Sequence, residues 1–144
     1  MDLPAGAFTV RRDIMFAHCD PAGIVFFPEF FRMFNDTFEA WFNTVLGVPM
    51  ADEFFVHNRM FPFVHIDCDF KVARKMGQTM DLTLVLTKVG RSSMHYSIVG
   101  HDDGVEILRA NLVTCVASKA TMKTIDIPPE IRGPLDAYLA LCAG

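Results

Sequence analysis

The residues best suited to chemistry lie in one short stretch, residues 20–28 (DPAGIVFFP), where a lone carboxylate precedes a predicted helix. Backbone N–H groups in the first turn of a helix have no partner within the helix and lie at the positive end of its dipole. Pro28 has no N–H, so the candidate donors are Phe27, Glu29 and Phe30. A carbonyl oxygen bound to such a donor would be polarised. Asp20 could then attack the carbonyl carbon or activate a water.

The same aspartate also has a purely structural interpretation. An Asp directly before a Pro often accepts a hydrogen bond from the backbone two residues further on and so forms an Asx turn. From the residues alone both interpretations of Asp20 stay open, and the structural one is the more common.

Other reactive sites are only weakly indicated. None of the four serines stands in a G-x-S-x-G motif, which disfavours a serine hydrolase of that kind. The adjacent side chains of His18 and Cys19 would point apart in an extended loop. Three possible metal ligands stand at every second position, His65, Asp67 and Asp69, which places them on one face of a strand. A solvated face of a sheet has the same pattern. We therefore expect no metal site, and hydrolysis by the carboxylate would need no cofactor.

A long amphipathic helix must position the reactive stretch. Pro28 suits the start of this helix, and Gly47 followed by Pro49 marks its end after about nineteen residues. Asn35 lies at the edge of its apolar stripe, where it could meet solvent or a ligand. The stripe has helical spacing and predicts a face packed on a sheet, and it consists of Phe27, Phe30, Phe31, Phe34, Phe38, Trp41, Phe42 and Val45.

Most of the remaining chain predicts strands. Residues 8–16 form a plausible first strand, and from Phe63 apolar and polar residues alternate with a period of two. Further strands are predicted at residues 80–89, 93–101 and 105–119, the last two joined by a tight Asp103-Gly104 turn. Residues 128–141 predict a short helix. The apolar helix can bury its stripe only if the sheet curls round it, which predicts an α+β fold with a curved antiparallel sheet wrapped around one long central helix.

Length and composition narrow the class of protein. The 144 residues suit a single domain, 1–144, and a hydrophobic content of 51% excludes a disordered chain. No apolar run is long enough to span a membrane, and the N-terminus lacks a secretory pattern. We therefore expect a cytoplasmic protein with four free cysteines. A mean hydropathy of +0.28 is high for a small soluble monomer and predicts apolar surface buried between subunits.

Charge is unevenly distributed along the chain. Residues 1–70 carry a net charge of −6, whereas residues 71–123 carry +4. Because no basic run is interleaved with aromatic residues, we expect no nucleic-acid groove, but the basic segment could hold a phosphate-bearing small ligand. Ordinary solvated strand ends are the alternative. The basic candidates are Lys71, Arg74, Lys75, Lys88 and Arg91.

The run HCDPAGIVFFPEFFRMF at residues 18–34 resembles the signature of hot-dog-fold acyl-CoA thioesterases, and it looks most similar to the 4-hydroxybenzoyl-CoA thioesterase family. The shared features are an aspartate, a Pro/Ala/Gly turn, two aliphatic residues, an aromatic pair and the entry to a long helix. Resemblance extends over residues 8–119. The chain departs from the family at His18, where many relatives carry an acidic residue, and in using two Phe for the aromatic pair.

This resemblance implies a hot-dog fold in which the family's catalytic carboxylate falls on Asp20 and its backbone donor to the thioester carbonyl on Phe27. In the family, basic side chains after the third and fourth strands hold the phosphates of coenzyme A, and Arg91 with the adjacent Ser92 is the nearest match. The implied reaction is hydrolysis of a small acyl-CoA, aromatic or short aliphatic, to a free acid and coenzyme A. Independently of the resemblance, a sheet curled round one helix leaves an edge and an outer face to be buried, so we expect at least a homodimer, with a homotetramer favoured.

Two other functions are compatible with the same fold. A non-catalytic acyl-CoA binding module would use the pocket with Asp20 in a structural role only. A hot-dog dehydratase or hydratase would need a histidine and a second acid facing the substrate, and His57, His65 and His95 stand in no recognisable acid–base motif. Release of thiol from acyl-CoA separates the first alternative from hydrolysis, and hydration of an enoyl-CoA identifies the second.

Overall fold

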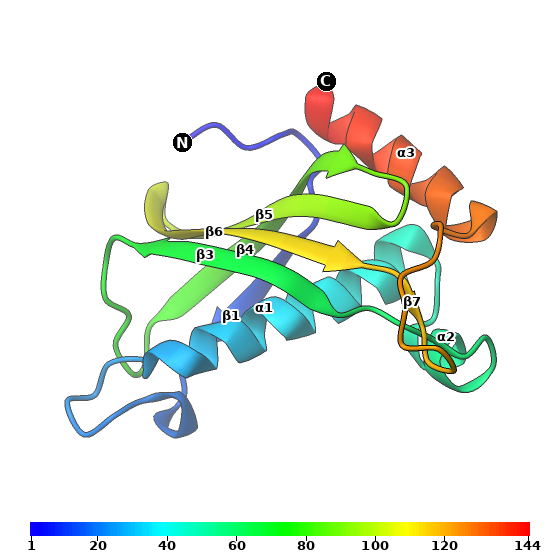
Figure 1. The fold of residues 1–144 in the computed structure, drawn as a ribbon. Coiled ribbons are helices and arrows are strands. Elements are labelled where there is room, and N and C mark those ends of the chain that lie inside the picture. The colour runs from blue at the N-terminus through cyan, green and yellow to red at the C-terminus, as the bar shows by residue number, and fades with distance from the viewer.

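A five-stranded antiparallel sheet packs against one long helix in the computed structural model, which describes all 144 residues (Figure 1). The strand order is β1-β4-β5-β6-β3, and one hydrophobic core lies between the sheet and the helix. The predicted α+β fold of a sheet around a long helix is therefore confirmed. The strands are β1 (Thr9–Asp13), β3 (Phe63–Phe70), β4 (Thr79–Val89), β5 (Ser93–Asp102) and β6 (Val105–Cys115).

Helix α1 (Phe27–Trp41) begins where the sequence predicts, and the helical segment that it forms with the following turn ends at the predicted Gly47. Pro28 lies in its first turn, and α1 continues directly into a π-helical turn, η2 (Phe42–Leu46). Gly47 follows with a φ of 67°, in the left-handed region that a glycine adopts without steric cost. Local backbone chemistry thus sets both ends of the helical segment.

The aromatic stripe of this segment is buried along its middle. Phe34, Phe38 and Trp41 are at most 2% exposed, and Phe38 stacks on Tyr96 of β5 with ring centroids 5.4 Å apart. The prediction is wrong for Phe27, which is 59% exposed, and for Val45, which is 41% exposed. Both lie on the same face of the helix as the buried residues, but they are in the first and last turns of the helical segment.

Strand β3 is an edge strand, and this explains why its apolar face is not buried. It pairs only with β6, with an irregularity between Phe63 and His65. Ile66 and Phe70, which face the side of the sheet occupied by α1, remain 39% and 49% exposed. An open edge with apolar side chains is a surface that isolated proteins usually cover or pair.

Three segments differ from the predicted elements. The first strand ends at Asp13 rather than residue 16, because Phe16–His18 forms a 3₁₀ turn, η1. The last strand divides at Cys115, and β7 (Ala117–Ser118) pairs with β2 (Arg59–Met60) in a separate two-stranded sheet. Helix α2 (Met50–Phe55) occupies a stretch for which the sequence predicted no element.

Helix α3 (Pro129–Ala143) has 15 residues and is longer than the predicted short helix. It covers the part of the β4 edge that the short strand β1 leaves free. The Tyr138 hydroxyl donates to the carbonyl of Leu84 at 2.7 Å and accepts the N–H of Phe8 at 2.7 Å. Burial raises the pKa of Tyr138 to about 12. None of the helices has the length and hydropathy needed to cross a membrane.

Candidate active site

The reactive stretch folds as a short hairpin that leads into α1; we call residues 18–27 the hairpin. Cys19 and Val25 form an isolated antiparallel bridge, and the Asp20 N–H donates to the carbonyl of Ile24 at 2.9 Å. Asp20 therefore lies in the turn of the hairpin, and Phe27 lies where its second strand becomes the helix. Both predicted catalytic groups belong to one local unit.

Asp20 forms the Asx turn that the structural interpretation anticipates. Its Oδ1 accepts the N–H of Ala22 at 2.9 Å, and the residue is half-buried. The second carboxylate oxygen, Oδ2, has no hydrogen-bond partner within the chain. The turn therefore orients the carboxylate while leaving one oxygen free to act on a ligand or a water.

Phe27 carries a free backbone N–H at the start of α1. Its N–H takes part in none of the turn, loop and cap hydrogen bonds of the chain, whereas the Glu29 N–H donates to the carbonyl of Phe26 at 2.9 Å. An unpaired N–H at the first position of a 15-residue helix lies at the positive end of the helix dipole. This site is suited to bind a carbonyl oxygen or an anion.

His18 has a structural role that the sequence left open. Its Nδ1 accepts the N–H of Met15 at 2.9 Å and so closes the turn η1. The Cys19 thiol donates to the Met15 carbonyl at 3.4 Å. The two adjacent side chains thus both bind the backbone and do not pair with each other as a thiol–imidazole dyad.

The hairpin is held by residues 71–78, which connect β3 to β4 and which we call the strap. The Val25 N–H donates to the carbonyl of Arg74 at 3.0 Å, and the Met76 N–H donates to the carbonyl of Gly23 at 3.0 Å. The strap in turn is bonded to the sheet, because the N–H groups of Lys71 and Val72 both donate to one carbonyl of β6. Nothing in the sequence pattern indicates this contact.

Two grooves lie along α1, a larger one between α1 and β3 and a smaller one between the hairpin, the start of α1 and the strap. Phe30 and Phe70, whose ring centroids are 5.4 Å apart, line the smaller groove. The smaller groove, of about 250 Å³, lies beside the hairpin and is lined by Phe27 and by residues of the strap. The larger groove has a volume of about 490 Å³ and includes Asn35. Its lining residues are Phe31, Arg32, Phe34, Asn35, Asp36, Phe63, Ile66 and Leu112.

Arg91 and Ser92, predicted to bind coenzyme A, lie in the turn between β4 and β5, at the end of the sheet remote from the hairpin (Figure 1). Strand β4, which separates the two ends, has 11 residues and is about 36 Å long at the usual rise per residue. The Arg91 side chain is exposed and pairs with Asp126 at 3.2 Å. One chain therefore does not bring Arg91 and Asp20 together.

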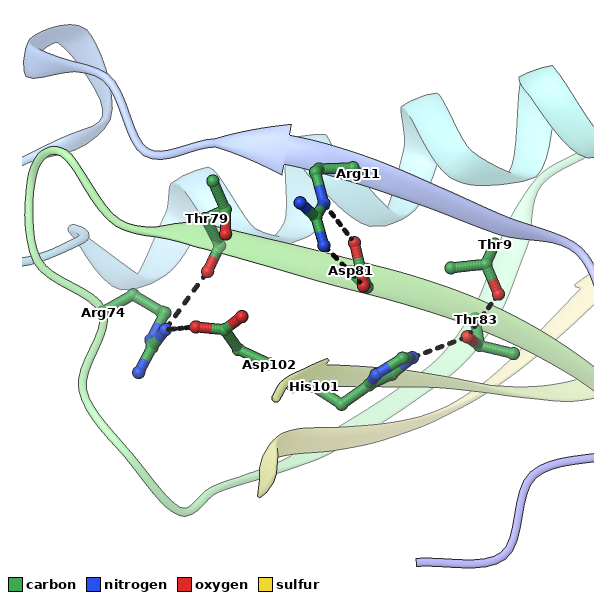
Figure 2. A network of polar contacts seen from close by, with 8 residues as sticks. All are labelled: Thr9, Arg11, Arg74, Thr79, Asp81, Thr83, His101 and Asp102. Carbon is green, nitrogen blue, oxygen red and sulfur yellow. Dashed lines mark hydrogen bonds and ion pairs between the residues drawn. The ribbon is translucent and has the colours of Figure 1, made fainter. Parts of the chain in front are cut away.

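Two of the other basic candidates already have acidic partners. Lys71 pairs with Glu106, and Arg74 pairs with Asp102 at 2.9 Å (Figure 2). Arg109 and Lys71 lower the pKa of Glu106 to about 2. These contacts depend on strands that are far apart in the sequence, so the sequence alone could not distinguish paired from free cations.

Potential metal ligands and acid–base histidines are dispersed over the molecule. His65 Nε2 pairs with Asp67 Oδ2 at 2.9 Å on an exposed part of the sheet, and no three His, Cys, Asp or Glu side chains form a group that could hold a metal ion. His57 lies 3.7 Å from Glu53. Neither His57, His65 nor His95 lines the larger or the smaller groove.

Comparison with known proteins gives consistent matches over most of the chain. The 1,4-dihydroxy-2-naphthoyl-CoA hydrolase of Crocosphaera subtropica is 26% identical over 124 residues, which cover 86% of this chain and 85% of that protein. Among solved structures, a 1,4-dihydroxy-2-naphthoyl-CoA thioesterase from Synechocystis superposes with a TM-score of 0.79 at 22% identity, covering 91% of this chain and 96% of the other.

A gentisyl-coenzyme A thioesterase has the same fold, with a TM-score of 0.80 at 20% identity and coverage of 89% of this chain and 99% of the other. The sequence also matches the family described as the thioesterase-like superfamily over residues 14–135. That match includes the hairpin, α1, the strap and every strand of the sheet except β1. The chain belongs to the thioesterase-like superfamily.

Proposed function

We propose that this protein hydrolyses an acyl-CoA thioester to a free acid and coenzyme A. The observation that carries the proposal is the unpaired Phe27 N–H at the start of α1, in the same hairpin as a carboxylate with one free oxygen. Membership of the thioesterase-like superfamily supports thioester chemistry at this site.

In the proposed mechanism, the Phe27 N–H donates to the thioester carbonyl oxygen and stabilises the negative charge that develops there. Asp20 either attacks the carbonyl carbon or takes a proton from a water that attacks it. The bond from carbon to sulfur then breaks, and the thiolate of coenzyme A leaves and takes up a proton. In the first route a water then hydrolyses the acyl–aspartate anhydride, which releases the free acid and regenerates the carboxylate.

An aromatic acyl group fits the larger groove between α1 and β3. Phe31 and Phe34 line it with their rings arranged edge to face, and Asn35 adds an amide that can bond a hydroxyl substituent. The relatives described above are named for aromatic CoA thioesters, which supports this substrate class. We propose a hydroxylated aromatic acyl-CoA as the substrate.

A second copy of the chain would complete the site. The open edge of β3 carries the exposed side chains of Val64, Ile66 and Phe70 and can pair with the same edge of a partner. Antiparallel pairing about a two-fold axis places the partner's turn between β4 and β5 at the hairpin end of this chain. Such a dimer would bring one chain's Arg91 to the same end as the other chain's Asp20, and the outer face of the sheet could support a tetramer.

The decisive variant is Asp20→Asn, because the asparagine side-chain oxygen can still accept the Ala22 N–H and so preserve the turn. We expect turnover of acyl-CoA, measured as released thiol, to fall at least a hundredfold while the melting temperature is unchanged. Asp136→Asn, an exposed change in α3, is the matched control. Near-normal turnover in folded Asp20→Asn would refute the assignment.

Assays on the wild-type protein distinguish hydrolysis from the two alternative functions, a binding module and a hydratase. A panel of aromatic and aliphatic acyl-CoAs, each tested for binding and for thiol release, identifies a binding module if ligands bind and no thiol appears. Hydration of an enoyl-CoA would identify a hydratase. Sedimentation that shows a fully active monomer would contradict the shared site.

A further inference from the structure

We propose that the ion pair between Arg74 and Asp102 positions the catalytic hairpin. In this proposal the pair keeps the strap docked on the sheet, and the strap sets the place of Asp20 and of the Phe27 N–H. The inference rests on the proposed catalytic roles of these two groups. Arg74 and Asp102 are positioning residues, since they act on the reaction through the hairpin.

Arg74 is anchored on the sheet side of the strap. Its residue is only 8% exposed, and its Nη1 donates to Asp102 Oδ2 at 2.9 Å and to the carbonyl of Thr79 at 3.1 Å (Figure 2). Its Nε donates to the carbonyl of Ala73 at 3.3 Å. A cation this deeply buried is retained only when it is paired and hydrogen-bonded, so these contacts define one position for the side chain.

The backbone of the same residue holds the hairpin. The carbonyl of Arg74 accepts the N–H of Val25, and two residues further on the Met76 N–H donates to the carbonyl of Gly23, both at 3.0 Å. Arg74 therefore links the end of β5, through its side chain, to the catalytic hairpin, through its main chain. A shift of the guanidinium group moves the carbonyl that supports Val25.

The hairpin has few other contacts that could set its place. Val25 is 7% exposed, but the residues of its turn, Pro21 and Ala22, are exposed, and Phe26 and Phe27 are 50% and 59% exposed. Its internal hydrogen bonds define its shape and not its position on the sheet. Besides the buried Val25 and the direct continuation into α1, attachment to the strap therefore fixes where Asp20 lies.

Small errors in position are costly in catalysis. A displacement of about 1 Å between reacting groups can lower a rate about a hundredfold, even when it originates away from the chemistry. Loosening the strap should therefore reduce kcat more than it changes KM, because the larger groove, in which we place the acyl group, is lined by α1, β3 and Leu112 and by no residue of the strap.

The test compares two ion pairs on the same sheet. Arg74→Met, Arg74→Lys and Asp102→Asn disturb the proposed device, while Arg11→Met and Asp81→Asn break the exposed pair at 3.0 Å that lies nearby in Figure 2 and has no bond to the strap. We expect Arg74→Met and Asp102→Asn to lower kcat about 10- to 100-fold with KM within about threefold, and the control variants to stay within about twofold. Arg74→Lys should retain part of the activity, because a lysine can replace one of the contacts.

Amide hydrogen exchange distinguishes local loosening of the strap from a general loss of stability. In Arg74→Met and Asp102→Asn the amides of Val25 and Met76 should exchange faster, while amides in the middle of β5 keep their protection. Combining Arg74→Met with Asp102→Asn should lower kcat no further than the stronger single variant does, because both changes disable the same contact.

Three results would overturn the inference. The first is that folded Asp102→Asn and Arg74→Lys have the same kcat as the control variants. The second is that these variants raise KM and leave kcat unchanged. The third is that the amide hydrogens of Val25 and Met76 exchange at the wild-type rate. If Asp20→Asn retains turnover, the proposed function fails. If Asp20→Asn is inactive and the ion-pair variants behave as the controls do, the positioning role alone fails.

Discussion

Replacing Phe27 by proline removes the proposed backbone donor and keeps a residue that suits the first position of a helix. Phe27 occupies the first position of α1, where proline is a favoured residue, and its N–H bonds to no other group of the chain. The preceding residue, Phe26, has a ψ of 124°, which is the extended conformation required before a proline. Phe27→Pro should therefore fold normally.

The size of the effect follows from comparison with Phe27→Ala. Both variants lose the half-exposed ring and its edge-to-face contacts with Phe26 and Phe31, whereas only the proline variant loses the N–H. The ratio of their rates therefore isolates the hydrogen bond to the carbonyl oxygen. Removing one donor of this kind costs about 3 kcal/mol of transition-state stabilisation, which is a reduction in kcat of about a hundredfold or more.

The assay is release of thiol from an aromatic acyl-CoA, with thermal unfolding of each variant measured in parallel. We expect Phe27→Ala to retain most of the wild-type kcat and Phe27→Pro to lose about a hundredfold, with similar melting temperatures. If folded Phe27→Pro turns over substrate as fast as Phe27→Ala, the Phe27 N–H does not bind the carbonyl oxygen and the proposed geometry is wrong.

Two further predictions concern stability. Tyr138→Phe leaves the Leu84 carbonyl and the Phe8 N–H without their shared partner, so the free energy of unfolding, measured by urea titration, should fall by about 1–3 kcal/mol; an unchanged value would show that water replaces the hydroxyl. Glu106 has a pKa lowered from 4.5 to about 2, so its stabilising contribution is complete above its unfolded pKa and is lost as the pH falls through its folded pKa. Between the unfolded and the folded pKa of Glu106, acid unfolding curves should therefore show a smaller loss of stability in Glu106→Gln than in the wild type. Parallel curves for the two proteins would contradict the role of Lys71 and Arg109.

Local backbone chemistry and long-range packing determine different parts of this fold. The long helix could be predicted because its ends depend on the backbone chemistry of single residues, Pro28 at the start and Gly47 at the end. The tight turn between β5 and β6 was likewise predictable, since Asp103 and Gly104 adopt positive φ values of 50° and 76°. The hairpin motif could be found because its residues are contiguous.

Helix α3 shows where local signals are overridden. Gly133 and Pro134 argue for an interruption, yet the helix continues through them for 15 residues. Ile131, Leu135 and Tyr138 lie on one face and are at most 4% exposed, so burial of this face outweighs the loss of one backbone hydrogen bond. The sequence shows the breaking residues but not the surface that the helix covers.

By itself the sequence determined the order of the long strands and the main helix, the ends of that helical segment and the residues of the candidate hairpin, because each depends on neighbours within a few positions. Tertiary structure alone decided that β3 lies at an open edge, that Arg91 lies at the other end of the sheet from Asp20, and that Arg74 is buried against Asp102. Those facts depend on which strands pair and in what order, and pairing between distant segments is set by the burial of the whole core rather than by local backbone preference.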